Sequence, residues 1–329
     1  MDFYTGIKID KVSFNIHHTD HIMVLGSCFA DNVGRRLLDG KFDCVVNPFG
    51  TLYNPLSILS AVEMMAQGKT FVSSDLFYSQ GLWHSWAHHG AFSSPSAEES
   101  LVLMNTSMER ARRQLADLDV LILTYGTAWV YRLSDASAHV VANCHKQSER
   151  MFIRQMEDVE ALEEAMCRTV EAVRAVSPST KFIFTVSPIR HVRDGMHANQ
   201  LSKAALLLAV DKTIKRCPDT AYFPSYEIMI DELRDYRFYD DDMVHPSNKA
   251  VEYIWERFSD TYFNRDTKDL MREWGKIALG IAHRPLHGNT DDYRRFIETL
   301  RDKIVKIKNK HPYLDVEKEL ELCNTRLGI

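Results

Sequence analysis

Short apolar runs alternate along the chain with segments whose apolar residues recur every three to four positions. Three runs are clear, at residues 22–25 (IMVL), 118–123 (LDVLIL) and 181–186 (KFIFTV). Each is too short for a helix and rich in branched residues, which predicts strands. Weaker strand candidates lie at 43–46 and 220–224. Runs that are apolar at almost every position are typical of strands buried on both faces of a parallel sheet.

Helical periodicity fills the segments between these runs. After the first run, Phe29, Val33 and Leu37 recur every four residues, and Gly40 is suited to end that helix. Three further segments show helical spacing: 158–176, 199–215 and 246–263. Strands that alternate with helices predict an α/β fold, here a three-layer α/β/α sandwich around a central parallel sheet.

The pattern changes after residue 265, where strand signals end. In the segment 291–323, apolar residues recur at helical spacing among dense charges, which predicts an amphipathic helical tail. We therefore divide the chain into an α/β domain, residues 1–265, and a helical C-terminal extension, residues 266–329. The apolar face of the extension is expected to pack onto the α/β core or onto a second copy of the chain, which would give a homodimer.

Composition and charge narrow the functional classes. The 329 residues carry a formal net charge of −5 and no long run of like charge, so no nucleic-acid or membrane-surface partner is predicted. No apolar run reaches the roughly 18 residues of a membrane span, and the charged N-terminal segment is unlike a secretory signal. The six cysteines show no CxxC spacing, which argues against zinc and disulfide scaffolds. We expect a cytoplasmic protein without a metal or organic cofactor.

A serine follows the first predicted strand directly. Gly26, Ser27 and Cys28 lead from that strand into the predicted helix. Ligands of open α/β sheets bind beyond the carboxyl ends of strands, where the helix N-terminus favours developing negative charge. Ser27 is therefore a candidate nucleophile, with helix capping as the structural alternative. Cys28 is a rival nucleophile, because a helix N-terminus favours a thiolate.

Asp242 and His245 lie three residues apart, just before the last predicted helix of the α/β domain. A loop can fold so that the aspartate accepts a hydrogen bond from one imidazole nitrogen. The other nitrogen is then free to take the proton of a serine. By itself this spacing also fits an ordinary solvated loop, so its meaning depends on the serine that follows the first strand.

The order of these motifs resembles the SGNH hydrolase superfamily, and Gly26–Ala30 (GSCFA) matches the motif of the GSCFA family. Segments 47–55 and 187–191 are similar to the same family, and the resemblance covers about residues 1–265. It implies a flavodoxin-like, SGNH-hydrolase-like fold. It also implies a triad of Ser27, Asp242 and His245, without defining a substrate.

The sequence departs from the superfamily at two places. Aligned on Gly26, Ser27 falls on the aspartate of the usual Gly-Asp-Ser and Cys28 falls on its serine. Both stay candidates, and we favour Ser27 because the bulky Phe29 indicates that the Cys28 segment turns inward. The second departure is in the block that usually reads Gly-x-Asn-Asp. Here Gly126 and Thr127 occupy that place and the asparagine, an oxyanion donor, is missing.

The remaining candidates are binding residues. The resemblance implies that the N–H of Gly50 binds the oxyanion, and Asn47 or another group would replace the missing amide. Arg190 and His191 follow the third clear strand, where either would contact an anionic substrate or order the site loop. His84 and His88 lie in the Trp- and His-rich segment 83–89, which we interpret as an aromatic core patch. A sugar-packing wall and a metal pair are the alternatives there.

Together these observations predict a serine-dependent ester hydrolase that acts on small O-acyl groups such as acetyl, with carbohydrate as a candidate carrier. Three alternatives stay open. One is an O-acyltransferase that uses the same triad, and another is a cysteine-dependent enzyme that uses Cys28. The third is a non-catalytic ligand-binding member of the fold, motivated by the missing asparagine.

Overall fold

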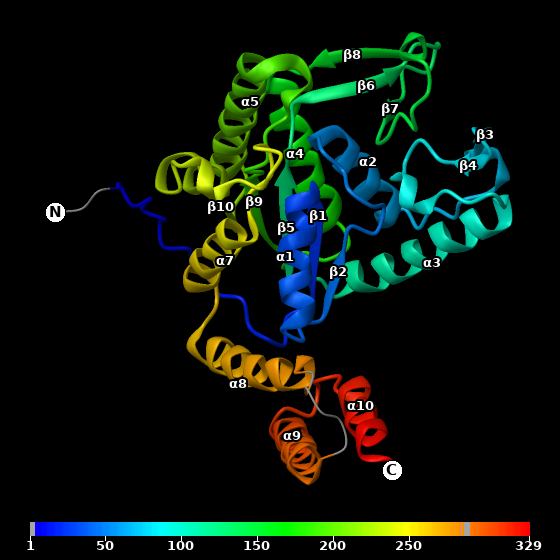
Figure 1. Cartoon of the computed structure of the whole chain (residues 1–329). Coiled ribbons are helices and arrows are strands. Elements are labelled where there is room, and N and C mark those ends of the chain that lie inside the picture. The colour runs from blue at the N-terminus through cyan, green and yellow to red at the C-terminus, as the bar shows by residue number, and fades with distance from the viewer. Residues whose placement is uncertain (1–3, 284, 286–289) are drawn as a thin grey trace.

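A five-stranded parallel sheet forms the centre of the molecule in a computed structural model that describes residues 4–283, 285 and 290–329 (Figure 1). Its strand order is β10-β9-β5-β1-β2. The strands are β1 (Ile22–Gly26), β2 (Cys44–Val46), β5 (Val120–Tyr125), β9 (Lys181–Val186) and β10 (Thr220–Phe223). All the predicted strands are confirmed, although β5 begins two residues later than the apolar run that predicted it. The chain leaves β1 first for β2 and later for β5 on its other side, so a ligand crevice is expected at the ends of β1 and β5.

Helices cover both faces of this sheet, which confirms the three-layer architecture. One face carries α1 (Cys28–Asp39) and α7 (Asn248–Tyr262). The other carries α2 (Pro55–Ala66), α3 (Ala97–Ala116), α4 (Val159–Arg174) and α5 (Gly195–Arg216). Between β10 and α7 lies the short α6 (Ser225–Glu227). The predicted helices at 158–176, 199–215 and 246–263 correspond to α4, α5 and α7, while α2 and α3 were not predicted.

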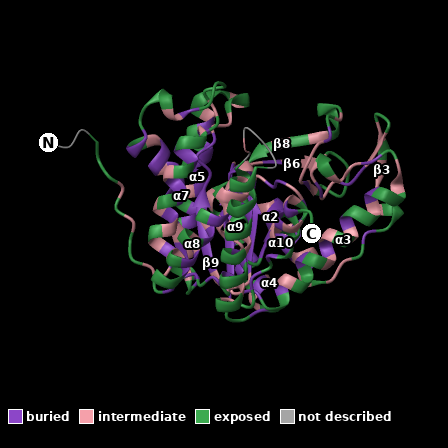
Figure 2. Cartoon of the chain, turned by 60° about the horizontal axis from the view of Figure 1, so that its bottom comes forward, coloured by how far each residue is buried: buried purple, intermediate pink, exposed green. Residues whose placement is uncertain are grey.

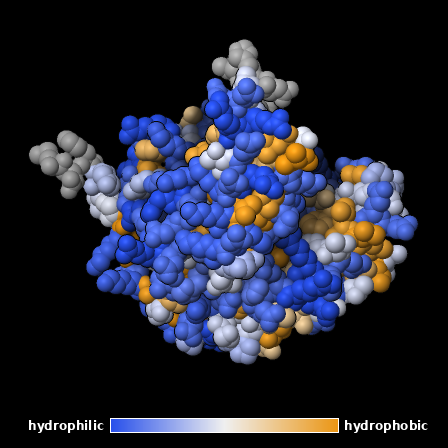
Figure 3. Space-filling view, turned by 90° about the horizontal axis from the view of Figure 1, so that it is seen from below, coloured by the Kyte–Doolittle hydropathy of each residue, from blue (hydrophilic) through white to orange (hydrophobic). Residues whose placement is uncertain are grey.

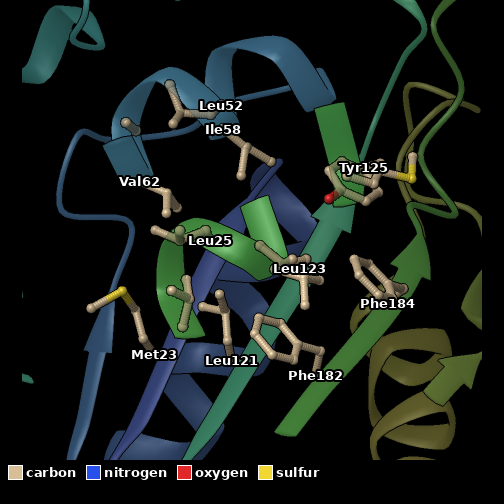
Figure 4. Close-up of a cluster of buried hydrophobic side chains, with 14 of the residues drawn as sticks. Met23, Leu25, Leu52, Ile58, Val62, Leu121, Leu123, Tyr125, Phe182 and Phe184 are labelled. Carbon is tan, nitrogen blue, oxygen red and sulfur yellow. The ribbon is translucent and has the colours of Figure 1, made fainter. Parts of the chain in front are cut away.

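The period-two alternation of strand side chains connects the sheet to both layers. Met23 and Leu25 of β1 pack into the cluster beneath α2 to α5, shown in Figure 4. Ile22 and Val24 point to the opposite cluster beneath α1 and α7. Every residue of β1 and β5 is buried, and Figure 2 shows buried residues gathered along the sheet and the inner helix faces. Burial on two faces explains why these strands are apolar at consecutive positions.

Two antiparallel insertions were not predicted. A hairpin consists of β3 (Phe77–Ser79) and β4 (Leu82–His84), and a three-stranded sheet consists of β6 (Trp129–Leu133), β7 (Val140–Val141) and β8 (Phe152–Met156). His88 follows the hairpin and stacks on Phe49 with 4.8 Å between ring centroids, which fits the aromatic core patch. Within the described residues, no group of three or more His, Cys, Asp or Glu side chains is arranged to hold a metal ion.

The C-terminal extension contains α8 (Arg265–Ala282), α9 (Asp291–Lys310) and α10 (Glu317–Leu327). These helices share a separate hydrophobic cluster. They contact the α/β part through Trp274, whose Nε1 donates to Asp39 O at 2.9 Å, and through the Lys41–Glu319 ion pair. In Figure 1 the extension lies at the opposite end of the sheet from β6 and β8. The boundary after residue 265 stays a prediction.

The predicted homodimer also stays a prediction. Seen from the side of the extension, the molecule is mainly hydrophilic, with separate hydrophobic patches (Figure 3). Large apolar side chains are exposed there singly, such as Leu279 and Tyr313, as on most protein surfaces.

Candidate active site

The turn after β1 holds Ser27 in a fixed position. Gly26 has φ +145°, and a Cβ there would lie 2.2 Å from Thr124 O, so only glycine fits. The Gly26 N–H donates to Asn47 Oδ1 at 2.8 Å, and the Ser27 N–H donates to Thr124 O at 3.1 Å. Ser27 is the N-cap of α1, where its Oγ accepts a long hydrogen bond of 3.4 Å from Phe29 N. The structural alternative, helix capping, is thus confirmed; Ser27 is 1% exposed, and its Oγ makes no other hydrogen bond within the described chain.

The Asp-x-x-His loop forms the dyad that its spacing predicts. Met243 adopts a left-handed conformation, φ +58°, which closes the loop. Asp242 Oδ1 accepts hydrogen bonds from the N–H groups of Val244 and His245, both at 2.9 Å. Asp242 Oδ2 lies 2.6 Å from His245 Nδ1. The backbone N–H and then the side chain of His245 lower the pKa of Asp242 to about 2, so the carboxylate is ionised at neutral pH. It therefore accepts the Nδ1 proton and leaves Nε2 free to accept another.

Ser27, Cys28 and His245 line one cavity of about 440 Å³. Its other lining residues are Tyr53, Asn54, Thr127, Trp129, Tyr131, Val141, Ala142, Asn143, Cys144, Arg154, Ile189, Arg190, His191, Arg193 and Asp194. Ser27 Oγ makes no hydrogen bond to His245 in the described chain, and catalytic hydrogen bonds are often long before substrate binds. The structure thus brings Ser27 and His245 to a common cavity at the carboxyl end of the sheet, while Asp242 contacts His245 without lining the cavity itself.

Cys28 differs in part from its predicted placement. The adjacent Phe29 turns into the core, with 1% of its surface exposed, as expected. Cys28 itself is half-buried and lines the cavity, where its Sγ lies 3.5 Å from the Tyr53 hydroxyl. The reason is the start of α1 at Cys28: one side of the first helical turn packs on the core while the other faces the cavity. The structure therefore leaves both nucleophile candidates in the site.

Gly50 and Asn47 are not among the residues that line the cavity. The Gly50 N–H donates to Asn47 O at 2.7 Å and is therefore not free for an oxyanion. Asn47 uses both ends of its amide, because Oδ1 accepts from Gly26 and Nδ2 donates to Asp31 at 2.6 Å. Asn47 thus stabilises the turn at Gly26 that precedes Ser27, and Gly50 binds to the backbone of Asn47.

Gly126 and Thr127 lie where the sequence places them, beside Ser27. A Cβ on Gly126 would lie 3.4 Å from Ser27 Cβ and 3.1 Å from His191 Nε2. However, the N–H groups of Gly126 and Thr127 both donate to Tyr53 O, at 2.8 and 3.0 Å. Their backbone donors are therefore already used.

Arg190 and His191 follow β9 and face the same cavity. Arg190 orders the Asp-x-x-His loop, because its Nη2 donates to the Tyr239 hydroxyl at 2.6 Å and its N–H donates to Val244 O at 3.3 Å. Burial, followed by the charges of Lys203 and His245, lowers the pKa of His191 to about 4. The imidazole is thus neutral at neutral pH, and its buried Nε2 has no hydrogen-bond partner among the described residues.

Sequence reasoning missed two groups of site residues. Trp129, Tyr131 and Arg154 come from the β6-β7-β8 insertion, where no motif identifies them. Arg154 contacts the loop after β9 through a bidentate ion pair with Asp194. Its Nη1 and Nη2 donate to Asp194 Oδ1 and Oδ2, both at 2.5 Å. The other omission is Lys203 of α5, which is 1% exposed although its helix position appeared ordinary.

Lys203 joins the two loops that frame the cavity. Its Nζ donates to Gly126 O and to Ser187 O, both at 2.7 Å, which fixes the ends of β5 and β9 relative to each other. Burial lowers its pKa to about 7.

Comparison with known families adds one firm identification. Residues 21–258 match the model of the GSCFA family, and residues 274–328 match the model described as GSCFA domain protein, C-terminal domain. The chain belongs to the GSCFA family. No curated protein shows significant sequence similarity to it. The described helices include none that is long and apolar enough to cross a membrane.

A distant similarity to a solved structure was also found. This structure is a carbohydrate esterase family 3 from Talaromyces cellulolyticus, with 12% sequence identity and a TM-score of 0.28. The match covers 50% of this GSCFA chain and 66% of that chain, just under two thirds of its length. At that TM-score the similarity is too weak to describe the site of this chain.

Proposed function

We propose that this GSCFA protein is an ester hydrolase of the SGNH type that cleaves small O-acyl groups through an acyl-serine intermediate. The observation that carries the proposal is the Asp242–His245 dyad. An ionised carboxylate holds one imidazole nitrogen at 2.6 Å, and His245 lines the same cavity as Ser27. A nucleophile, a base and a group that orients the base are the components of a serine hydrolase site.

The proposed reaction has two steps. In the first step, Ser27 Oγ bonds to the ester carbonyl carbon, its proton passes to His245 Nε2, and the carbonyl electron pair moves onto oxygen. The intermediate then collapses, and the alcohol leaves with the proton from His245. In the second step, water repeats the attack with His245 as base, which releases the acid and restores Ser27. Asp242 stays ionised throughout and stabilises the imidazolium.

The cavity supports a small substrate with a ring on the alcohol side. Its volume of about 440 Å³ is at the lower end of ligand pockets. Trp129 and Tyr131 supply aromatic surface to its wall, and such surface suits a sugar ring. We therefore propose O-acylated carbohydrate as the substrate class, with O-acyl transfer to a second sugar as the alternative fate of the acyl group.

A fluorophosphonate probe tests the nucleophile without knowledge of the natural substrate. We expect a single adduct on Ser27 by intact mass and peptide mapping, and no adduct in Ser27→Ala. The Cys28→Ala protein should still be labelled, since the hydroxyl is intact. Absence of an adduct in folded protein would argue against the triad.

Cys28 is the second candidate, because its half-buried Sγ lies in the same cavity. If Cys28 is the nucleophile, iodoacetamide abolishes turnover of an aryl acetate, and Ser27→Ala keeps that turnover while Cys28→Ala loses it. Hydrolysis is separated from transfer by adding a sugar acceptor. Acceptor-dependent product with negligible release of free acid identifies a transferase.

A further inference from the structure

The backbone N–H groups that the sequence places nearest Ser27 are already engaged. The Ser27 N–H donates to Thr124 O, and those of Gly126 and Thr127 donate to Tyr53 O. The N–H of Cys28, at the first position of α1, has no acceptor in the described chain. One backbone donor at a helix N-terminus is thus free. Oxyanion sites usually combine two or more donors, because the charge develops on a single oxygen.

The segment that precedes α2 runs across the ends of β1 and β5. The Leu52 N–H donates to Gly26 O at 2.9 Å, and Tyr53 O accepts the two N–H groups that follow β5. The next residue, Asn54, is 6% exposed and lines the cavity together with Ser27. Asn54 is therefore fixed beside the loop of Gly126 and Thr127, although it is distant from that loop in sequence.

The cap of α2 orients the Asn54 amide. Its Oδ1 accepts a hydrogen bond from Ser57 N at 2.8 Å, so the Nδ2 group is held on the other side of the amide. Nδ2 has no hydrogen-bond partner among the described residues, and it is not one of the fully enclosed polar atoms that lack a partner. An amide donor on a cavity wall, with its oxygen fixed and its nitrogen free, is pre-organised to meet an acceptor.

We infer that Asn54 Nδ2 is a catalytic oxyanion donor and replaces the amide that the Gly126–Thr127 loop lacks. When Ser27 Oγ bonds to the carbonyl carbon, the electron pair of the C=O bond moves onto oxygen. Nδ2–H and the Cys28 N–H donate to that oxygen, while the serine proton passes to His245. No bond to Asn54 forms or breaks. The inference rests on the proposed ester hydrolysis and identifies how the same site stabilises its transition state.

Other side-chain donors fit this role less well. Both ends of the Asn47 amide are engaged, and Asn47 does not line the cavity. His191 Nε2 is fully enclosed, so an oxyanion would reach it only after a rearrangement. The Asn143 amide also lines the cavity and likewise accepts a backbone N–H, from His145 at 2.7 Å. It comes from the β6-β7-β8 insertion and serves as the competitor in the test.

Asn54→Ser removes the donor and keeps a helix-capping oxygen. With an aryl acetate as substrate, we expect kcat to fall about 10²–10³-fold, the range for loss of one oxyanion donor, with little change in KM. Asn54→Asp also caps α2 but places a carboxylate against the developing charge, so its kcat should fall further. Asn264 caps α8 in the same way, with Oδ1 accepting from Thr267 N at 2.8 Å. Asn264→Ser is therefore the matched control, and its kcat should equal that of the wild type.

The outcomes separate this inference from the function on which it rests. A wild-type protein with neither turnover nor a fluorophosphonate adduct contradicts both. An active wild type whose Asn54→Ser variant keeps its kcat, with an unchanged urea midpoint, contradicts the Asn54 role alone. The role is also overturned if Asn143→Ser lowers kcat and Asn54→Ser does not, because the donor then comes from the insertion.

Discussion

At the scale of single residues, the site depends on polar groups whose charge is set by their surroundings. Asp242 is ionised because three hydrogen bonds reach its carboxylate. His191 is neutral because it is buried. Lys203 is buried, has no carboxylate partner among the residues that the structure describes, and donates to two carbonyl oxygens, Gly126 O and Ser187 O.

The first prediction concerns the pH dependence of Lys203. Its pKa falls from the ordinary 10.5 to about 7 in the folded protein, so between these values the unfolded chain binds more protons. The free energy of unfolding therefore rises with pH through this window, by up to about 1.4 kcal/mol per pH unit. The loss of stability that comes from burying the charged amine is fully present below about pH 7. Urea unfolding at several pH values from 7 to 10 measures this effect. As pH rises, the free energy of unfolding of the wild type should increase relative to that of Lys203→Met. A constant difference between the two proteins would contradict a buried, titrating lysine.

The second prediction concerns Asp242. Asp242→Asn keeps the shape of the loop but removes the charge and favours the wrong imidazole tautomer, with Nε2 protonated. The rate constant for fluorophosphonate labelling of Ser27 should fall by about 10³–10⁴-fold, as for the orienting aspartate of serine proteases. Asp241→Asn, next to it and with an exposed side chain, is the control and should label at the wild-type rate. Equal rates for both variants would show that Asp242 does not orient the base.

At the scale of elements, the site is built where strands end and neighbouring segments cross. Ser27 lies directly after strand β1, and Gly126 lies in the loop after β5. The segment before α2 crosses both ends. The insertion β6-β7-β8 forms one wall of the cavity, and Arg154 of β8 connects that wall to the loop after β9 through Asp194. Arg154 also lies over the Trp129 ring, with 4.3 Å from its guanidinium carbon to the ring centroid.

A third prediction follows for that connection. Arg154→Gln removes the ion pair and leaves Asp194 without its cation, so the insertion should separate more often from the loop after β9. We expect faster amide hydrogen exchange in residues 129–156 and a KM about ten-fold higher, near 1.4 kcal/mol of lost binding. Arg150 is exposed on the same insertion, and Arg150→Gln should leave exchange at the wild-type level. Unchanged exchange in Arg154→Gln would mean that packing alone holds the wall.

At the scale of the whole molecule, the cavity and the C-terminal helices lie at opposite ends of the sheet. The cavity lies at the carboxyl ends of the strands, while the C-terminal helices contact the region near Asp39 and Lys41, beyond the other end of α1 from Ser27. Trp274 is central to this contact, because it is 3% exposed and its ring lies 5.2 Å from Lys41 Nζ. Stability and chemistry should therefore separate in mutants of this contact.

The fourth prediction tests that separation. Trp274→Ala should lower the free energy of unfolding by about 3–5 kcal/mol, the usual cost of truncating a buried large aromatic side chain. Trp274→Phe keeps most of the packing and loses the hydrogen bond to Asp39, so about 1 kcal/mol is expected. Urea unfolding measures both values. Under native conditions, the rate of fluorophosphonate labelling at Ser27 should not change in Trp274→Phe, and a large decrease would show that the extension acts on the site.

The sequence by itself determined the strands of the central sheet, the helices α1, α4, α5 and α7, and the two motifs of the proposed triad. These features are local: consecutive apolar residues follow from burial on two faces, and Ser27 and Asp242–His245 depend on turns of a few residues. The short β2 and the helices α4, α5 and α7 were likewise visible in apolar periodicity and capping residues. The resemblance to the GSCFA family likewise depends on short runs of contiguous residues, such as 26–30.

Only the tertiary structure decided which groups meet at the cavity. Gly50 occupies the sequence position expected of an oxyanion donor, but its N–H is taken by Asn47 O. In the sequence Asn54 lies within the segment 47–55 without an assigned role, and Lys203 lies in the predicted helix at 199–215. Asn54 is positioned by its neighbour Tyr53, whose carbonyl accepts hydrogen bonds from Gly126 and Thr127. Lys203 is positioned by its own hydrogen bonds to Gly126 O and Ser187 O. Local pattern determines which element a residue joins, whereas a hydrogen bond between distant segments exists only once the chain has packed.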